Sequence, residues 1–225
     1  MTRKIAIDGP AGAGKSTIAR KVADRLGFIY IDTGAMYRTV ALNILRCGEN
    51  PEDEVGSSRA LKYTDIVLEN EKGNQKIILN GEDVTEQIRT VEVGKAASLS
   101  SRYSAVRKKL TEMQRKIASE KNVVMDGRDI GTTVLPDADL KIYLTASAEI
   151  RAKRRMHQLE EQGETNLDLT RIEEEIRARD KQDMEREISP LRRAEDAILI
   201  DSSDMTLDEV EDAIISAYRV RCPKF

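Results

Sequence analysis

A stretch close to the start of the chain has the residue types and spacing of a phosphate-binding loop. Residues 9–16 read Gly-Pro-Ala-Gly-Ala-Gly-Lys-Ser, which fits the pattern G-x-x-x-x-G-K-[ST]. The glycines let backbone N–H groups turn toward a phosphate, the lysine can reach the β- and γ-phosphates, and the serine hydroxyl can ligate Mg²⁺. The pattern predicts a nucleoside triphosphate site, with a glycine-rich turn that fits by chance as the alternative. The residues expected there are Gly9, Pro10, Ala11, Gly12, Ala13, Gly14, Lys15, Ser16 and Thr17.

The segments on either side of the loop support this prediction. Residues 4–8 form a short apolar run that is typical of a buried parallel strand. After the loop, apolar residues recur at helical spacing, so we expect a helix over 16–26. Strand, loop and helix therefore follow one another in the order that such a site requires.

A second group of polar residues follows the next apolar run. Residues 28–32 are expected to form a strand and residues 35–46 a helix, with Thr33, Tyr37 and Arg38 at or near the start of that helix. Ligands in open α/β sheets bind beyond the carboxyl ends of the strands, and helix N-termini attract anions. Arg38 could hold a phosphate and Tyr37 could stack or donate a hydrogen bond. The alternative is a solvated arginine beside a packed tyrosine.

A third group stands at the end of residues 123–126, another expected strand. Asp126 ends this strand, and a carboxylate there can help to organise Mg²⁺ beside a phosphate-binding loop. Arg128 and Asp129 follow at once, which is a high density of charge for the end of a core strand. A charged surface turn is the alternative.

The most charged part of the chain is predicted to form two helices, over 148–162 and 169–187, joined by a linker that contains Gly163. Three positions on each helix share one face: Arg151, Arg154 and Arg155 on the first, and Arg179, Asp183 and Arg186 on the second. Two such faces around a flexible joint could close on a nucleotide phosphate. Because glutamates are frequent on the same helices, solvated i,i+4 ion pairs are the alternative.

Expected strands at 4–8, 28–32, 123–126, 140–144 and 197–201, separated by helices, predict an α/β fold with a five-stranded parallel sheet flanked by helices. A hairpin is expected at 65–69 and 76–80 around a turn at 71–74. Helical spacing covers 91–119, and Thr206 is expected to cap a last helix to about Arg219. The predicted organisation is a core of 1–59, 93–146 and 188–225, an inserted subdomain at 60–92 and a helical lid region at 147–187.

Composition excludes several classes of protein. The 225 residues carry a net charge of −3 from 37 basic and 40 acidic side chains, so no global basic field favours a nucleic acid polymer or an anionic membrane. No apolar segment approaches the length of a membrane span, and the start of the chain does not resemble a signal peptide. The two cysteines form no C-x-x-C. We expect a cytoplasmic protein without an obligate protein partner.

The motifs together resemble those of bacterial cytidylate kinases. They are GPAGAGKS at 9–16, DTGAMYR at 32–38, GEDVT at 81–85 with IRT at 88–90, and DGRDIGT at 126–132. The likeness continues through Arg154-Arg155-Met156, Pro190-Leu191 and Asp201-Ser202, so it covers essentially the whole chain. It implies a P-loop NTPase fold of the nucleoside monophosphate kinase type, with a core, a nucleotide-binding insertion at 60–92 and a lid. The implied reaction is transfer of the ATP γ-phosphate to CMP or dCMP with Mg²⁺, in pyrimidine nucleotide metabolism.

The resemblance also implies roles for single residues. It places Thr33, Tyr37, Arg38, Arg128 and Arg186 near the CMP phosphate or its pocket, Ser98, Arg107 and Asp129 at the base, and Arg179 with Asp183 at the ribose. We expect Lys15, Arg128, Arg154 and Arg155 to act in catalysis, and Ser16, with Asp126 as a further candidate, to hold Mg²⁺. The single histidine, His157, is expected on the lid surface with no direct role. A phosphate monoester is already largely dianionic at neutral pH, so the acceptor needs no general base.

Three other functions are weighed against this one. A sugar or shikimate kinase would share the loop and the lid but would not need acidic and basic groups arranged for a base edge. A GTPase would need the guanine-reading pattern N-K-x-D, which the chain lacks. A nucleotide-gated interaction module without catalysis is the alternative from another class.

Overall fold

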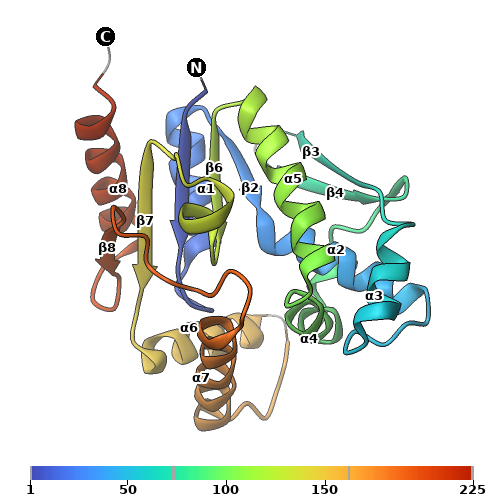
Figure 1. Ribbon diagram of the computed structural model, residues 1–225. Coiled ribbons are helices and arrows are strands. Elements are labelled where there is room, and N and C mark those ends of the chain that lie inside the picture. Colours follow the sequence, from blue (N-terminus) through green and yellow to red (C-terminus); the bar gives the residue numbers. More distant parts are fainter. Residues whose placement is uncertain (1, 72–73, 162, 224–225) are drawn as a thin grey trace.

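The computed structural model describes residues 2–71, 74–161 and 163–223. At its centre lies a five-stranded parallel sheet in the order β2-β6-β1-β7-β8 (Figure 1). The strands are β1 (Lys4–Asp8), β2 (Ile29–Asp32), β6 (Val123–Gly127), β7 (Leu140–Thr145) and β8 (Ile198–Asp201). All five expected strands are therefore confirmed. Because they are parallel, their carboxyl ends meet at one edge of the sheet.

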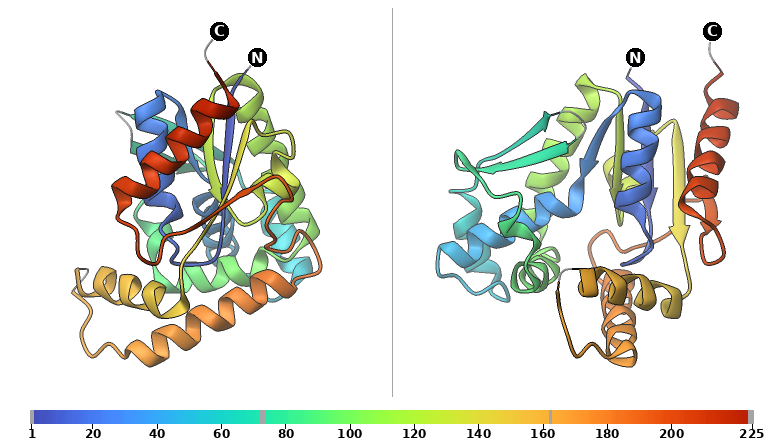
Figure 2. Two further views of the ribbon diagram at one scale, coloured as in Figure 1. Left: turned by 90° about the vertical axis from the view of Figure 1, so that its left-hand side faces the viewer. Right: turned by 180° about the vertical axis from the view of Figure 1, so that it is seen from behind.

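Helices cover both faces of this sheet, which explains why successive strand residues are apolar. Ile5 and Ile7 of β1 belong to a core cluster with residues of α1 (Lys15–Leu26) and α8 (Leu207–Arg221). Ala6 belongs to the cluster formed with α2 (Thr33–Arg46) and α5 (Ser104–Glu120). The two layers are visible from opposite sides in Figures 1 and 2.

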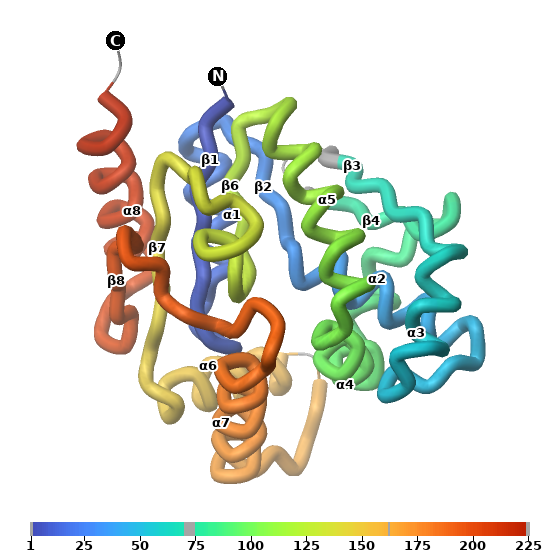
Figure 3. Tube along the Cα trace, viewed as in Figure 1, coloured from blue at the N-terminus to red at the C-terminus, as the bar shows by residue number. Residues whose placement is uncertain are grey.

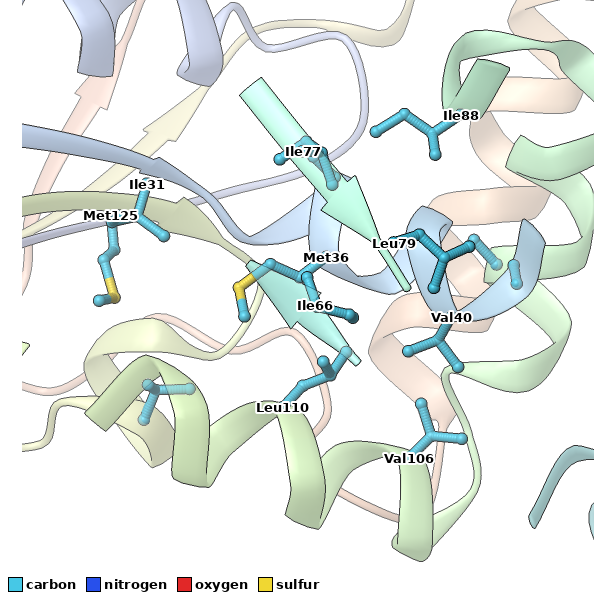
Figure 4. Packing of buried hydrophobic residues seen from close by; sticks show 14 of the residues in the cluster. Ile31, Met36, Val40, Ile66, Ile77, Leu79, Ile88, Val106, Leu110 and Met125 are labelled. Carbon is cyan, nitrogen blue, oxygen red and sulfur yellow. The ribbon is translucent and has the colours of Figure 1, made fainter. Parts of the chain in front are cut away.

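The predicted hairpin is present and forms a second, three-stranded antiparallel sheet of β3 (Ile66–Glu71), β4 (Asn74–Leu79) and β5 (Glu82–Asp83). The centre of its predicted turn, residues 72–73, lies outside the described residues. Ile66, Ile77 and Leu79 pack in the same cluster as Val40 of α2 and Leu110 of α5 (Figure 4). The hairpin therefore shares its buried side chains with the core.

Two features of the surrounding helices differ from expectation. A helix that was not predicted, α3 (Glu54–Leu61), begins after Asp53, whose carboxylate accepts the N–H groups of Val55 and Gly56. The stretch 91–119, expected from its spacing to be helical, forms two helices, α4 (Val91–Ser100) and α5, with a break between them. At this break the backbone of Tyr103 is extended, and its hydroxyl donates to the carbonyl of Glu52. This distant contact lies beyond the reach of local sequence patterns.

The two lid helices lie below the carboxyl edge of the sheet (Figures 1 and 3). They are α6 (Ala148–Glu161) and α7 (Leu169–Glu185), close to their expected bounds, and they pack on each other through Ala152, Ile172 and Ile176. From the end of α7, the chain returns across the sheet edge to β8 (Figure 3). α8 then begins at the expected cap, where Thr206 and Glu209 form a reciprocal capping box. None of the helices within the described ranges is long and apolar enough to cross a membrane.

Candidate active site

The loop after β1 has the backbone that its glycines predict. A side chain at Gly9 would place Cβ 1.9 Å from the carbonyl oxygen of Leu144, so no other residue fits there. Gly14 precedes α1 in a left-handed conformation (φ 84°), and no side chain caps the helix. The first turn of α1 also lacks acidic residues. Its N–H groups are thus suited to an anion, as the motif requires.

Lys15 is buried at the start of α1, where its Nζ donates to the carbonyl of Pro10 at 2.6 Å. Burial lowers the pKa of this ammonium group, and the charge of Arg128 lowers it further. A phosphate bound nearby would restore the charged form, because an anion favours the protonated lysine.

Ser16 and Asp126 lie side by side, although they are 110 residues apart in the sequence. Ser16 Oγ donates to Asp126 Oδ2 at 2.8 Å, and Tyr30 OH donates to Asp126 Oδ1 at 2.9 Å. Burial and then the charge of Asp32 raise the pKa of Asp126. A hydroxyl and a carboxylate beside a phosphate-binding loop are the oxygen ligands that Mg²⁺ takes, together with waters and phosphate oxygens. The two residues therefore fit a magnesium ion, and Tyr30 fixes the orientation of the carboxylate.

A cluster of arginines stands next to the loop. Arg128 Nε donates to Asp183 Oδ2 at 2.8 Å, which brings the end of β6 and helix α7 together. Although part of Arg179 is accessible to solvent, the burial of the rest and the charges of Arg128, Arg38 and Arg155 lower its pKa to about 10. Several positive groups held close together favour a multiply charged anion.

A buried polar network adjoins this cluster. Arg107 Nη2 donates to Asp129 Oδ2 at 2.5 Å, while Arg186 Nη2 lies 3.4 Å from Asp129 Oδ1 and Arg186 Nη1 lies 3.7 Å from Asp183 Oδ1. Arg107 also lies over the ring of Tyr37, with Cζ 5.5 Å from the centroid. Burial raises the pKa of Tyr37 to about 12, so the phenol stays protonated at neutral pH. Four segments distant in sequence thus meet in one buried polar network.

The start of α2 adds two further predicted residues. Thr33 Oγ1 donates to the carbonyl of Asp126 at 2.6 Å. Arg38 folds back over the first turn, where its Nη2 donates to Asp32 Oδ2 at 3.1 Å. The same Asp32 accepts the N–H of Ala35 as the cap of the helix. Arg38 is thereby held at the edge of the arginine cluster.

Three predicted residues make other contacts in this structure. Arg154 donates to the hydroxyl of Ser202 at 3.1 Å and to the carbonyl of Ser202 at 2.7 Å. Arg155 donates to Gln158 on its own helix, although it is close enough to Arg179 to affect that group's pKa. The carbonyl of Ser98 accepts from Gln182 of α7 at 3.1 Å. Their predicted roles toward ATP and the base stay predictions.

A family model described as cytidylate kinase matches residues 5–220. The chain belongs to the cytidylate kinase family. It is 50% identical over 214 residues to a cytidylate kinase of Caldicellulosiruptor bescii, covering 95% of this chain and 94% of that protein. A cytidylate kinase of Carboxydothermus hydrogenoformans is 52% identical over 207 residues, with 92% and 93% covered. One from Bacillus subtilis is 48% identical over 213 residues, with 95% of each protein covered.

Solved structures show the same fold at low identity. A shikimate kinase from Acinetobacter baumannii in complex with shikimate has a TM-score of 0.50 at 18% identity, covering 100% of this chain and 97% of that one. An uncharacterized protein from Eubacterium ventriosum has a TM-score of 0.55 at 16% identity, with 98% and 99% covered. Likeness at this level concerns the fold, and it confirms the α/β P-loop NTPase architecture.

The sequence did not single out three residues that make contacts at this site, Tyr30, Asp8 and Asp180. Tyr30 binds Asp126, and Asp8 accepts the N–H groups of Ile130 and Gly131 at 2.8 and 2.7 Å. Arg151, expected on a phosphate-facing side of α6, is instead buried and paired with Asp180 of α7. A sequence feature could have pointed to each of the two aspartates as a site residue. Asp8 ends a strand as Asp126 does, and Asp180 follows Arg179 directly.

Proposed function

We propose that the chain transfers the γ-phosphoryl group of ATP to CMP and dCMP. The observation that carries this proposal is the arrangement of Asp129 between Arg107 and Arg186, beside an arginine cluster that reaches the phosphate-binding loop. Asp129 with its two arginines suits the edge of a base, and the arginine cluster suits phosphates. A donor and an acceptor nucleotide can therefore meet at the carboxyl edge of the sheet.

The base side of the pocket favours cytosine over uracil. Cytosine presents an N4 amino donor where uracil presents a carbonyl acceptor. An ionised aspartate can only accept hydrogen bonds, so Asp129 matches cytosine and opposes uracil. Arg107 supplies donors that suit the acceptors of the pyrimidine ring. Asp129 accepts from Arg107 through Oδ2, which leaves Oδ1 for a longer contact with Arg186 and for the amino group.

Charge neutralisation and positioning account for the transfer step. In this proposal, Lys15 contacts the β- and γ-phosphates of ATP, Arg128 and Arg38 contact the acceptor phosphate, and Arg179 with Asp183 serves the ribose. Ser16 and Asp126 would hold Mg²⁺, whose charge would neutralise phosphate oxygens. The acceptor phosphate has its second pKa at about 6 and so reacts without losing a proton to the protein. No role for His157 is needed, and this residue lies exposed on α6 with Nδ1 3.5 Å from Oε1 of Glu161.

The test is a panel of acceptors. Purified protein is given ATP and Mg²⁺ with CMP, dCMP, UMP, AMP or GMP, and ADP release is measured. CMP and dCMP are expected to give the highest kcat/KM values, and Lys15→Ala is expected to remove most of kcat while leaving the thermal midpoint close to that of the parent. No transfer to any monophosphate, with ATP still bound, would favour an interaction module instead. Efficient turnover by a folded Lys15→Ala variant would show that the site is assigned wrongly.

A further inference from the structure

The backbone of Ala11, inside the phosphate-binding loop, is held by the lid at both its N–H and its carbonyl group. Its N–H donates to Asp180 Oδ1 of α7 at 3.2 Å, and its carbonyl accepts from Arg151 Nη1 of α6 at 2.9 Å. These two side chains also form an ion pair, with Arg151 Nη1 2.7 Å from Asp180 Oδ2. One residue of the loop and both lid helices thus form a closed ring of contacts.

This ring is buried and has further anchors. The side chains of Arg151 and Asp180 are 7% and 11% exposed. Arg151 Nε donates to the carbonyl of Ala146 at 2.8 Å, which ties it to the segment between β7 and α6. The backbone of α6 also approaches the loop closely, since a Cβ at Gly12 would lie 3.3 Å from Arg151 Cβ. Arg151 therefore fixes the start of the lid, the loop and α7 relative to one another.

We infer that Arg151 and Asp180 are positioning residues that set the orientation of the phosphate-binding loop. The Ala11 N–H donates to the carboxylate of Asp180, so it is not available to a phosphate. The phosphate is left to the other N–H groups of the loop. Each loop peptide constrains the next, and the position of Ala11 thereby limits the orientations open to residues 12–14. The contacts that the two residues make are with the protein, so they act through the loop rather than on the substrate.

Position and charge predict opposite effects when Asp180 is removed. A carboxylate next to a phosphate site repels the ligand, so a role through charge alone predicts tighter ADP binding after the change. Asp180 also adds to the negative field that stabilises the charged form of Arg128. A positioning role predicts weaker ADP binding, because the Ala11 N–H loses its acceptor and Arg151 its counterion. CMP should be unaffected, since its predicted contacts have ion pairs of their own.

The experiment is calorimetric binding of ADP with Mg²⁺, and separately of CMP, to the full chain and to Asp180→Ala, Asp180→Asn and Arg151→Lys. The control is Glu173→Ala, which removes a carboxylate that pairs with Arg177 on the exposed side of the same helix. We expect ADP affinity to fall by about tenfold or more in Asp180→Ala, which is the size of one charged hydrogen bond. Asp180→Asn should lose less, because the amide oxygen still accepts the Ala11 N–H. CMP affinity should stay within about twofold in every variant.

Several outcomes would overturn the inference. They are ADP affinity that is unchanged or increased in Asp180→Ala, an equal loss of ADP and CMP affinity, or the same loss in the Glu173→Ala control. If Asp180→Ala does not fold, Asp180→Asn and Arg151→Lys carry the test, because each retains part of the ring. The inference rests on the proposed function in that it assigns the loop to the donor nucleotide. A parent chain that binds no ADP would contradict that assignment, whereas normal ADP binding in the parent and in all variants would contradict the inference alone.

Discussion

Arg107 and Asp129 form a buried ion pair that joins helix α5 to the loop after β6. The two side chains are 5% and 6% exposed, with Nη2 and Oδ2 2.5 Å apart. The loop after β6 is also tied to the end of β1, because Asp8 accepts two of its N–H groups. These contacts hold the ion pair from α5 and from β1, so the protein itself fixes the orientation of the Asp129 carboxylate.

This orientation leads to a prediction for Asp129→Asn. The amide keeps the size of the side chain but can turn to donate or accept, so the penalty against uracil should shrink and the bond to cytosine should weaken. Each effect is on the order of 1–3 kcal/mol. The ratio of kcat/KM for CMP to that for UMP should therefore fall by at least about tenfold. An equal loss on CMP and UMP would mean that Asp129 serves the fold or the phosphate instead of the base.

Gly34 is expected to be essential for the position of Arg38. A Cβ at Gly34 would lie 3.1 Å from Asp32 Oδ1 and 3.2 Å from Arg38 Nη1, so Gly34→Ala should push the guanidinium away from the start of α2. Alanine is favoured over glycine in helices by up to about 1 kcal/mol, which offsets the crowding of the capping Asp32 Oδ1, so the variant should be about as stable as the parent. We expect a higher KM for CMP without a lower thermal midpoint.

Gly94→Ala in α4 is the matched control, since a Cβ there meets nothing within 4 Å. It should change neither the KM for CMP nor kcat. If Gly34→Ala behaves like this control, Arg38 does not need its observed position to bind the acceptor.

The lid arginines Arg154 and Arg155 offer a test of closure. In this structure Arg154 binds Ser202 and Arg155 binds Gln158, both at a partly exposed surface. If the two groups move onto ATP during turnover, replacing both with alanine should lower kcat by orders of magnitude. Arg171→Ala, which removes an exposed pair with Glu175, should cost at most about 1 kcal/mol of stability and no activity. Normal kcat in the double variant would leave Arg154 and Arg155 as surface residues.

Asp8 should make stability depend on pH. Burial raises its pKa from 3.8 to about 6 in the folded chain, so the folded state binds this proton more tightly than the unfolded state does. The stabilisation from Asp8 is therefore fully present below the unfolded pKa and is lost as the pH rises through about 6. The total change is on the order of 3 kcal/mol.

The measurement is chemical unfolding of the parent and of Asp8→Asn between acidic and neutral pH. The stability of the parent relative to the variant should decrease across this range and then level off. Two pH profiles that run parallel would show that Asp8 does not titrate in this range.

The sequence predicted those parts of the fold and site that depend on local pattern. The loop at 9–16, the five strands and the cap at Thr206 each follow from a few neighbouring residues. The family resemblance placed Arg107 and Asp129 at the base, but their ion pair was not predicted, because residues 22 positions apart on different elements leave no periodic signal. The contacts of Ala11 with Arg151 and Asp180 span 140 and 169 positions and were not predicted. Arg151 was expected to face a phosphate but pairs with Asp180. Helical spacing shows which residues share a face of a helix, but not what that face contacts.

The shared packing of the hairpin bears on how the chain unfolds and how its parts move. Because Ile66, Ile77 and Leu79 are buried against α2 and α5, the backbone amides of β3 and β4 should exchange hydrogen only when the larger core opens (Figure 4). A chain with residues 60–92 excised would leave Val40 and Leu110 without their cover, so this segment cannot be removed as an independent unit. α2 contacts α3, α4 and β4, and it carries Arg38 at its start. We therefore expect any rigid-body rotation of the insertion to take α2 with it, with hinges at the ends of α2 and α5 rather than at residues 60 and 92.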